Sequence, residues 1–196
     1  MRGTKLAVVA SDSMVRVWDV SRLKDAEQHT ATVQKKWGMG GLLATFPGAA
    51  PYIAPEIEFP CTKIDSLGMW GASGTYSALA WVDDFHLLAV AVNGIRVAKE
   101  LHLLDLTQKT AISKISFSHT LYRAVASDGV AVTGGSELVL WQIRGGEIQR
   151  NRTLATVPSM SHLVNTLSRA FMISNLHAGY VASADPRGNI VVWDVR

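Results

Sequence analysis

The side chains best suited to hold a metal ion are six histidines and a single cysteine. A protein metal site needs several ligands at short, regular spacings, such as two histidines four residues apart or paired cysteines. No two histidines have that spacing, and Cys61 is the only cysteine. The sequence therefore predicts no metal site and no internal disulfide. We expect every histidine to be an ordinary strand or loop residue. These histidines are His29, His86, His102, His119, His162 and His177.

Two further patterns bear on a nucleophile or a phosphate-binding loop. Ser21 and Lys24 have the S-x-x-K spacing of penicillin-recognising enzymes, but the other motifs of those enzymes are missing. The glycine-rich segments 38–41 and 134–136 lack the Lys-Ser/Thr pair of a phosphate-binding loop, so we expect both to be turns. The sequence thus predicts no catalytic residue, no cofactor-binding residue and no cofactor.

Composition favours one globular domain with a substantial core. The chain has 196 residues, of which 48% are hydrophobic and 18% charged, and its formal net charge is +3. Lysines and arginines are scattered, with no run longer than Lys35-Lys36. Nucleic acid is therefore not an expected partner, because its recognition needs a clustered basic surface.

The chain carries no pattern of a secretory leader or a membrane span. Met1–Lys5 leads into only a few apolar residues. The longest apolar stretch, Leu87–Val92, is far short of the about 20 residues needed to cross a bilayer. The lone Cys61 is compatible with a reducing compartment. We expect an intracellular protein, cytoplasmic or nuclear.

The elements that would have to position any site are clearest at the C-terminus. An apolar run, 180–184, is followed by turn residues and by a second run, 189–195, rich in β-branched residues. Asp185 can bond the backbone ahead of it, and Gly188 suits the fourth turn position. These features predict a β-hairpin whose second strand ends on Trp193-Asp194.

The same pattern occurs near the N-terminus. Residues 6–10 are apolar, turn residues follow, and 15–20 alternate before reaching Trp18-Asp19, with Asp12 six positions before the tryptophan. Both hairpins resemble the second and third strands of a WD repeat, the building unit of a family of β-propellers. The resemblance implies that the Asp12 carboxylate ties down backbone donors in the turn between the two strands.

Two middle units repeat this rhythm less closely. In 76–117 the Trp-Asp position is held by Leu104-Asp105, and in 121–157 by Trp141-Gln142; the unit 168–196 contains the C-terminal hairpin. The first-strand alanines of these units are 44 and 46 residues apart, close to the period of about 40–45 residues for a propeller blade. These alanines are Ala80, Ala124 and Ala170.

The first unit, 5–37, is expected to take its outer strand from 30–37. The stretch 38–75 that follows contains four prolines, which interrupt every apolar run before it can become a central strand. We therefore interpret 38–75 as a long inserted loop. Loops of this length are uncommon in compact domains and are often functional. The alternative is a degenerate blade.

The resemblance to WD-repeat propellers implies an all-β fold, a partial β-propeller of about four blades with four strands each. The chain starts at the second strand of one blade and stops after the third strand of another, as in a fragment of a larger ring. Open blades leave strand edges and apolar faces exposed, so we expect a completing chain or self-association. Trp18 and Trp193 are expected to be buried between neighbouring sheets.

The implied function is a non-catalytic protein–protein interaction scaffold, part of a larger protein or complex, because such folds present rigid loop faces. One alternative is a propeller enzyme whose active residues lie in missing blades. The other is a weak phosphate- or nucleic-acid-binding propeller. Its basic residues would be Lys35, Lys36, Arg144, Arg150 and Arg152.

We expect other proteins to bind on the loop face that such propellers share between blades. The apolar and aromatic residues of 38–75 predict that this stretch docks a partner or covers a blade edge; the alternative is that it packs on its own blade. The predicted partner-binding residues are Asp12, Ser13, Tyr52, Phe59, Trp70, His119, His162 and Arg187.

Overall fold

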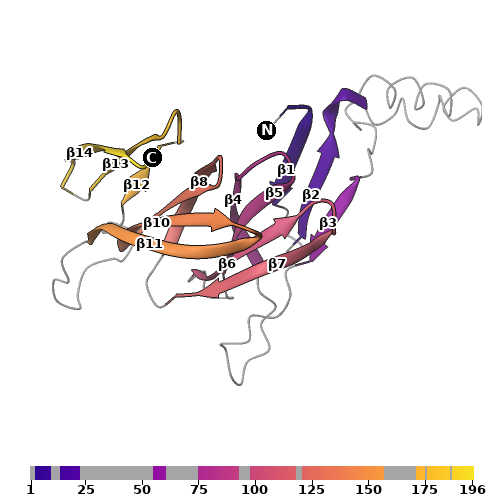
Figure 1. Ribbon diagram of the computed structural model, residues 1–196, viewed down its shortest axis with the longest axis horizontal. Helices are drawn as coiled ribbons and strands as arrows, with labels where there is room; N and C mark the ends of the chain where they lie inside the picture. Colours follow the sequence, from indigo (N-terminus) through magenta and orange to yellow (C-terminus); the bar gives the residue numbers. More distant parts are fainter. Residues whose placement is uncertain are drawn as a thin grey trace, which may run out of the picture.

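The computed structural model describes residues 3–9, 14–22, 55–60, 75–92, 98–117, 121–156, 171–174, 176–185 and 187–196. In these residues the chain forms four antiparallel sheets and one 3-10 turn, η1 (Val20–Arg22), without an α-helix. The prediction of an all-β fold is confirmed. Figure 1 shows the sheets side by side, with strands close in sequence belonging to the same sheet.

Each sheet is a meander in which neighbouring strands follow one another along the chain. Sheet 1 contains β1 (Lys5–Val9), β2 (Met14–Asp19) and β3 (Ile57–Pro60). Sheet 2 contains β4 (Thr75–Trp81), β5 (His86–Val92), β6 (Ala98–Asp105) and β7 (Thr110–Ser116). Sheet 3 contains β8 (Leu121–Ser127), β9 (Val130–Gly135), β10 (Glu137–Arg144) and β11 (Glu147–Thr156). Sheet 4 contains β12 (Met172–Ile173), β13 (Tyr180–Ala184) and β14 (Ile190–Asp194).

Strand β3 lies within 38–75, so the interpretation of this stretch as a loop does not hold for Ile57–Pro60. Ile57 pairs with Val17 and Phe59 with Val15, which places β3 beside β2 on the side opposite β1. Pro60 is compatible with this strand because β3 is an edge strand, where a missing N–H breaks no ladder. The outer position of sheet 1 is thus held by β3. The expected outer strand 30–37 lies outside the described residues.

Within the described residues the core consists of three apolar clusters. One includes Val15, Val17 and Phe59 of sheet 1 with Leu87 and Leu104 of sheet 2. The second joins sheets 2 and 3. It includes Val90, Leu101, Leu103, Val139 and Trp141. The third joins sheets 3 and 4. It includes Val132, Leu138, Leu140, Phe171 and Val181. The sheets are therefore held face to face mainly by burial of apolar side chains.

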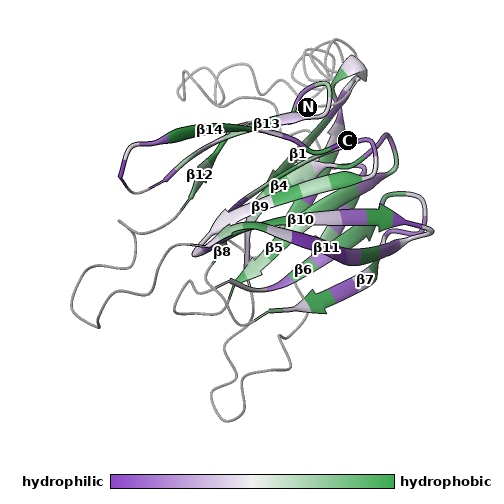
Figure 2. Cartoon of the chain, turned by 60° about the vertical axis from the view of Figure 1, so that its left-hand side comes forward, coloured by the Kyte–Doolittle hydropathy of each residue, from purple (hydrophilic) through white to green (hydrophobic). Residues whose placement is uncertain are grey.

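Burial on both faces explains why some strands are apolar throughout and others alternate. In β5 every residue after His86 is buried, because sheet 2 is covered by sheet 1 on one face and by sheet 3 on the other. In β1, by contrast, Leu6 and Val8 are exposed while their neighbours are half-buried. Figure 2 shows this difference as long hydrophobic segments in the middle sheets.

An aspartate at the end of β2, β6 and β14 closes the turn that follows, in three of the four sheets. Asp19 Oδ1 accepts from the backbone N of Ser21 at 2.9 Å, and Asp105 Oδ1 accepts from that of Thr107 at 2.7 Å. Asp194 Oδ1 accepts in the same way from Arg196 at 3.2 Å. The aspartate of each Trp-Asp or Leu-Asp pair thus supplies the acceptor that an Asx-type turn requires.

The residue just before this aspartate, or before Gln142 in sheet 3, faces the preceding sheet. Leu104 and Trp141 do so and are fully buried, and the indole Nε1 of Trp141 donates to Thr133 Oγ1 at 2.8 Å. Trp193 makes the equivalent bond to Ser183 Oγ, also at 2.8 Å, but is only half-buried. Trp18 is half-buried too, opposite exposed Leu6 in the ladder. The expectation of two buried tryptophans is therefore wrong in degree: no described sheet precedes Trp18, and no described fourth strand lies beside Trp193.

Gly134 is a strand residue rather than part of the expected turn 134–136. It pairs with Leu138 near the end of β9, where sheet 4 approaches closely. A Cβ at this position would lie 2.7 Å from the carbonyl oxygen of Phe171, closer than side chains tolerate. The neighbouring Gly135 carbonyl accepts from the backbone N of Phe171 at 2.8 Å. Glycine here permits direct backbone contact between sheets 3 and 4.

Replacing Trp141 with alanine should lower the free energy of unfolding by about 3–5 kcal/mol, because the change leaves a cavity between sheets 2 and 3 and an unpaired Thr133 hydroxyl. Trp193→Ala is the matched control, since the half-buried indole makes the same kind of hydrogen bond; its cost should be about 1–2 kcal/mol. Urea denaturation followed by circular dichroism measures both. Equal costs would contradict the packing described for the two tryptophans.

Candidate functional site

A buried polar cluster lies on sheet 2. His102 is 0% exposed, and its Nε2 lies 2.8 Å from Glu100 Oε2 while its Nδ1 lies 3.0 Å from the Tyr76 hydroxyl. A neutral imidazole with its proton on Nε2 satisfies both contacts, donating to the carboxylate and accepting from the phenol. Ser116 Oγ lies 3.5 Å from Glu100 Oε1. His102, Tyr76 and Glu100 are buried and Ser116 is exposed at the rim, so the cluster links β4, β6 and β7 and its imidazole is not open to a substrate.

The protonation state of this cluster follows from its burial. Burial lowers the pKa of His102 below its ordinary value, and the nearby charge of Lys114 acts in the same direction. The hydrogen bond to Glu100 opposes this shift without reversing it. His102 is therefore neutral near pH 7, which agrees with the hydrogen bonds to Tyr76 and Glu100.

The outer face of sheet 4, the face turned away from sheet 3, is the largest apolar feature exposed among the described residues. Met172, Ile190 and Val192 are 60%, 74% and 65% exposed. The register puts them on one face, since Met172 and Ile190 both pair with Ala184, and Val192 pairs with Ala182. Exposed apolar side chains gathered on one face of a sheet indicate an interaction surface.

The outer face of sheet 1, turned away from sheet 2, is also partly apolar. Leu6 and Val8 are exposed at 37% and 39%, beside half-buried Trp18. An ion pair crosses this face, with Arg16 Nε donating to Glu58 Oε1 at 2.8 Å. This face is therefore more polar than the outer face of sheet 4.

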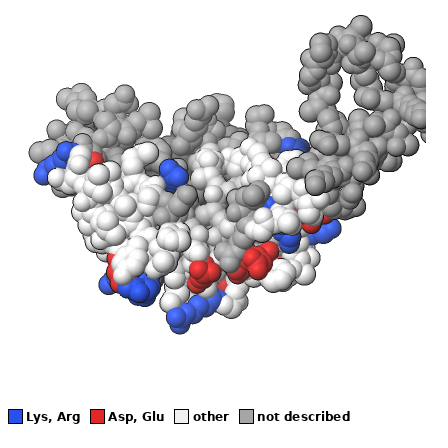
Figure 3. Space-filling model, turned by 90° about the horizontal axis from the view of Figure 1, so that it is seen from above, with Lys and Arg blue, Asp and Glu red and all other residues white. Residues whose placement is uncertain are grey.

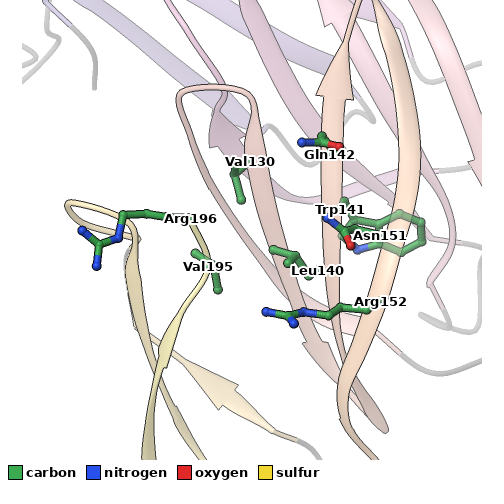
Figure 4. A pocket seen from close by; sticks show the side chains of 8 residues that line it. All are labelled: Val130, Leu140, Trp141, Gln142, Asn151, Arg152, Val195 and Arg196. Atoms are coloured by element: carbon green, nitrogen blue, oxygen red, sulfur yellow. The ribbon is translucent and has the colours of Figure 1, made fainter.

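A cleft of about 260 Å³ lies between sheets 3 and 4. Its apolar walls are Val130 and Leu140 from sheet 3 and Val195, which follows β14. Figure 4 shows the Arg152 side chain extending from β11 toward the C-terminal strands, while the Arg196 guanidinium points away from the cleft. Figure 4 labels the remaining lining residues, Trp141, Gln142 and Asn151.

The arginines around the cleft differ in their bonding. Arg196 Nη2 donates to Asp194 Oδ2 and to the Tyr180 hydroxyl, each at 2.6 Å. The hydrogen bonds from Arg196 lower the pKa of Asp194 to about 2. Arg150, outside the cleft, donates to Glu137 Oε2 at 2.7 Å. The Arg152 side chain is exposed and has no hydrogen bond or ion pair within the described part of the chain.

No extended basic surface is present among the described residues. Figure 3 shows basic and acidic side chains in small mixed groups on the face that it presents. Of the basic residues considered for phosphate or nucleic acid, Arg150 is paired with Glu137, and Arg144 and Arg152 are exposed on the neighbouring strands β10 and β11. Lys35 and Lys36 lie outside the described residues.

Two of the predicted partner-binding residues are described. Arg187 is exposed in the β13–β14 turn, where its backbone N donates to Asp185 Oδ1 at 2.8 Å. Phe59 is only 2% exposed and packs between sheets 1 and 2, so its side chain is not available to a partner. The others lie outside the described residues. They are Asp12, Ser13, Tyr52, Trp70, His119 and His162.

Within the described ranges, no group of three or more histidine, cysteine, aspartate or glutamate side chains is arranged to hold a metal ion. No helix of that part of the chain is long and apolar enough to cross a membrane. The features that sequence reasoning missed are the exposed face around Ile190 and the cleft at Arg152. The apolar run 190–192 was a signal for the first, because it continues on both faces of a strand that has no described outer neighbour.

Comparison with known proteins identifies the fold. The sequence matches no protein-family model and no curated protein. Among solved structures, the β-propeller domain of Cps50 (Swd1) from Myceliophteria thermophila matches 98% of this chain and 51% of its own, at 13% identity and a TM-score of 0.58. The WD40 β-propeller domain of Doa1 matches 96% of this chain and 46% of its own, at 11% identity and a TM-score of 0.53. A chain of the Mitotic Checkpoint Complex matches 98% and 46%, at 12% identity and a TM-score of 0.56.

At these identities the likeness concerns the fold. The four sheets have the arrangement of WD40 β-propellers, which confirms the propeller prediction in partial, unclosed form. The chain spans about half the length of each of these three solved structures.

The stability of the fold should fall as the pH drops below about 6.5, because the unfolded chain then protonates His102 while burial keeps the folded-state pKa lower. The loss should continue until the pH passes the folded-state pKa. Urea unfolding over this pH range measures the effect, and nuclear magnetic resonance titration reports the His102 midpoint directly. In His102→Gln, which cannot titrate, the pH dependence should be weaker. An unchanged pH dependence in this variant would contradict the assignment.

Proposed function

We propose that this partial WD40-type propeller is a non-catalytic scaffold for protein–protein interaction that works as part of a larger protein or complex. The observation that carries the proposal is the outer face of sheet 4. In the described structure, both faces of sheets 2 and 3 and the inner faces of sheets 1 and 4 are covered by another sheet. On the outer face of sheet 4, by contrast, Met172, Ile190 and Val192 are exposed together. A second protein surface would bury them in the way that sheet 3 buries the opposite face.

The chemistry of the described residues supports binding over catalysis. In the strongest candidate for a reactive constellation, the group around His102, the imidazole itself is fully buried. The cleft between sheets 3 and 4 contains arginine, amide and apolar groups, and its lining has no carboxylate, histidine or hydroxyl that could act as a base or nucleophile. Such a lining can recognise a ligand without transforming it.

The fold neighbours agree with this role. One of them is a chain of the Mitotic Checkpoint Complex, an assembly of proteins. The present chain has about half the length of that neighbour, so the partners of the complete neighbour do not transfer to it. What transfers is the general use of stacked sheets as a rigid platform.

A photo-reactive amino acid placed at Val192 should form a covalent adduct with a partner protein in cells that naturally carry this gene, since Val192 is 65% exposed on this face. The same probe at Thr107, exposed in the β6–β7 turn, is the control and should give far less adduct. Mass spectrometry identifies the products.

The variant Ile190→Glu/Val192→Glu tests the same surface without a probe. It should lose the partner, because two buried charges would oppose docking, while the circular dichroism spectrum and the urea midpoint stay native. Equal adduct yields at the two probe positions, or a partner that tolerates the double variant, would contradict the proposal.

A further inference from the structure

Sheet 4 has three described strands where sheets 2 and 3 have four. In sheet 3 the third strand, β10, has β9 on one side and β11 on the other. In sheet 4 the equivalent strand, β14, has β13 on one side and no described strand on the other. Alternate N–H and C=O groups along that second edge are therefore available to pair with an added strand.

The packing of sheet 2 against sheet 3 indicates what a fourth strand contacts. Ser113 of β7 pairs with Leu103, the residue just before the Leu104 position. Its Oγ accepts from the backbone N of Ile148 at 3.2 Å, so a side chain of one outer strand holds the backbone of the next outer strand. Ser113 thus marks the place on sheet 2 where the fourth strand of sheet 3 lies.

The same register position on sheet 3 is Arg152. It pairs with Leu140, the residue just before Trp141, as Ser113 pairs with the residue before Leu104. Arg152 therefore faces the place where a fourth strand of sheet 4 would lie, and Figure 4 shows it pointing toward the C-terminal strands. The cleft of about 260 Å³ beside it is the space that the side chains of such a strand would fill.

Residues of β14 on this side are also incompletely covered. Val191 and Trp193 alternate with the outward-facing Val192 and so face sheet 3. Val191 is nevertheless 44% exposed, and Trp193 is half-buried although Trp141 at the equivalent position is buried. An added strand would cover both, which accounts for the incomplete burial of these two side chains.

The chemistry of the cleft specifies the occupant. Ser113 can accept a backbone N–H, but an arginine only donates, and its planar guanidinium matches a carboxylate. Arg152 has no partner within the described part of the chain, Arg196 is engaged by Asp194, and no acidic residue lines the cleft. The walls next to Arg152, Leu140 and Val195, are apolar.

The geometry points to a peptide-binding site at the free edge of β14: an extended segment of a partner protein pairs with β14 and presents to the cleft a Glu or Asp opposite Arg152, flanked by apolar residues. This inference rests on the proposed scaffold function and names the chemistry of one partner segment. Main-chain pairing supplies affinity, and the side chains facing the cleft supply selectivity. The site differs from the outer face of sheet 4, since it lies between sheets 3 and 4.

The test uses the whole chain and two capped, dye-labelled peptides, Thr-Val-Thr-Glu-Thr-Val-Thr and the same sequence with Lys in place of Glu. Fluorescence anisotropy should give saturable binding of the Glu peptide and at least about tenfold weaker binding of the Lys peptide. A Glu peptide with N-methyl groups on alternate amides should not bind, because it cannot extend a sheet. Absence of saturable binding by the Glu peptide would overturn the inference.

Charge reversal separates a specific contact from general attraction. Arg152→Glu should reverse the preference between the two peptides, whereas Arg123→Glu, an equal charge change at an exposed residue of β8 away from the cleft, should leave it intact. Both substitutions are at exposed positions, and circular dichroism checks that the variants fold. Equal binding of the two peptides by the native chain, or a preference that Arg152→Glu leaves unchanged, would overturn the assignment of Arg152.

Amide hydrogen exchange distinguishes the possible occupants. The Glu peptide should slow exchange along β14. In the free chain, the amides that point to the free edge of β14 should exchange fast. Slow exchange already present in the free chain at low concentration would show the edge filled by the chain itself, and slowing with rising protein concentration would show a second copy; either result overturns a partner peptide. If the edge site fails while the Val192 adduct persists, the scaffold function stands and uses the outer face of sheet 4.

Discussion

Burial of one sheet face by the next is the interaction on which the rest of this structure depends. Side chains alternate between the two faces of each sheet, so Val15 and Val17 of sheet 1 share one face and meet Leu87 and Leu104 of sheet 2. Sheets 2 and 3 satisfy this requirement on both faces, and β5 after His86 and half of β10 are buried. A single sheet of this kind could not bury its apolar surface alone, which is why the units occur as a stack.

Polar groups support this stack where they are fully paired. Glu100 could not be buried beside apolar strands without partners, and His102 and Ser116 provide them. The turn carboxylates work differently, because Asp105 and its equivalents satisfy nearby backbone donors without depending on another sheet. Among the described residues the first device is found in sheet 2. The second recurs at Asp19 and Asp194. The turn-closing aspartate is therefore shared by more of the sheets than the buried Glu100–His102 pair.

Sequence patterns were sufficient for features that depend on near neighbours in the chain. Strand periodicity and repeat spacing predicted the hairpins of sheets 2 and 3, and Asp185 closes its turn as its position suggests, accepting from the backbone of Arg187 and Asn189. Features that depend on distant pairing were not predictable. Phe59 looked like a surface aromatic because its partner strand, containing Val15, lies more than forty residues earlier. The position of Arg152 depends on irregular register around Leu140, which no periodicity reveals.

The open stack also has a mechanical consequence. In a closed ring every blade is braced by two others, whereas here sheets 1 and 4 each have one described neighbour. A pulling force applied to the two ends would therefore peel the outer sheets away first. The pair formed by sheets 2 and 3 would yield last, because it shares the cluster around Trp141, the backbone bond from Asp128 to Val82 at 2.8 Å and the bond from Ile148 to Ser113. Resistance to unfolding under force is therefore greatest between sheets 2 and 3 and lower at sheets 1 and 4.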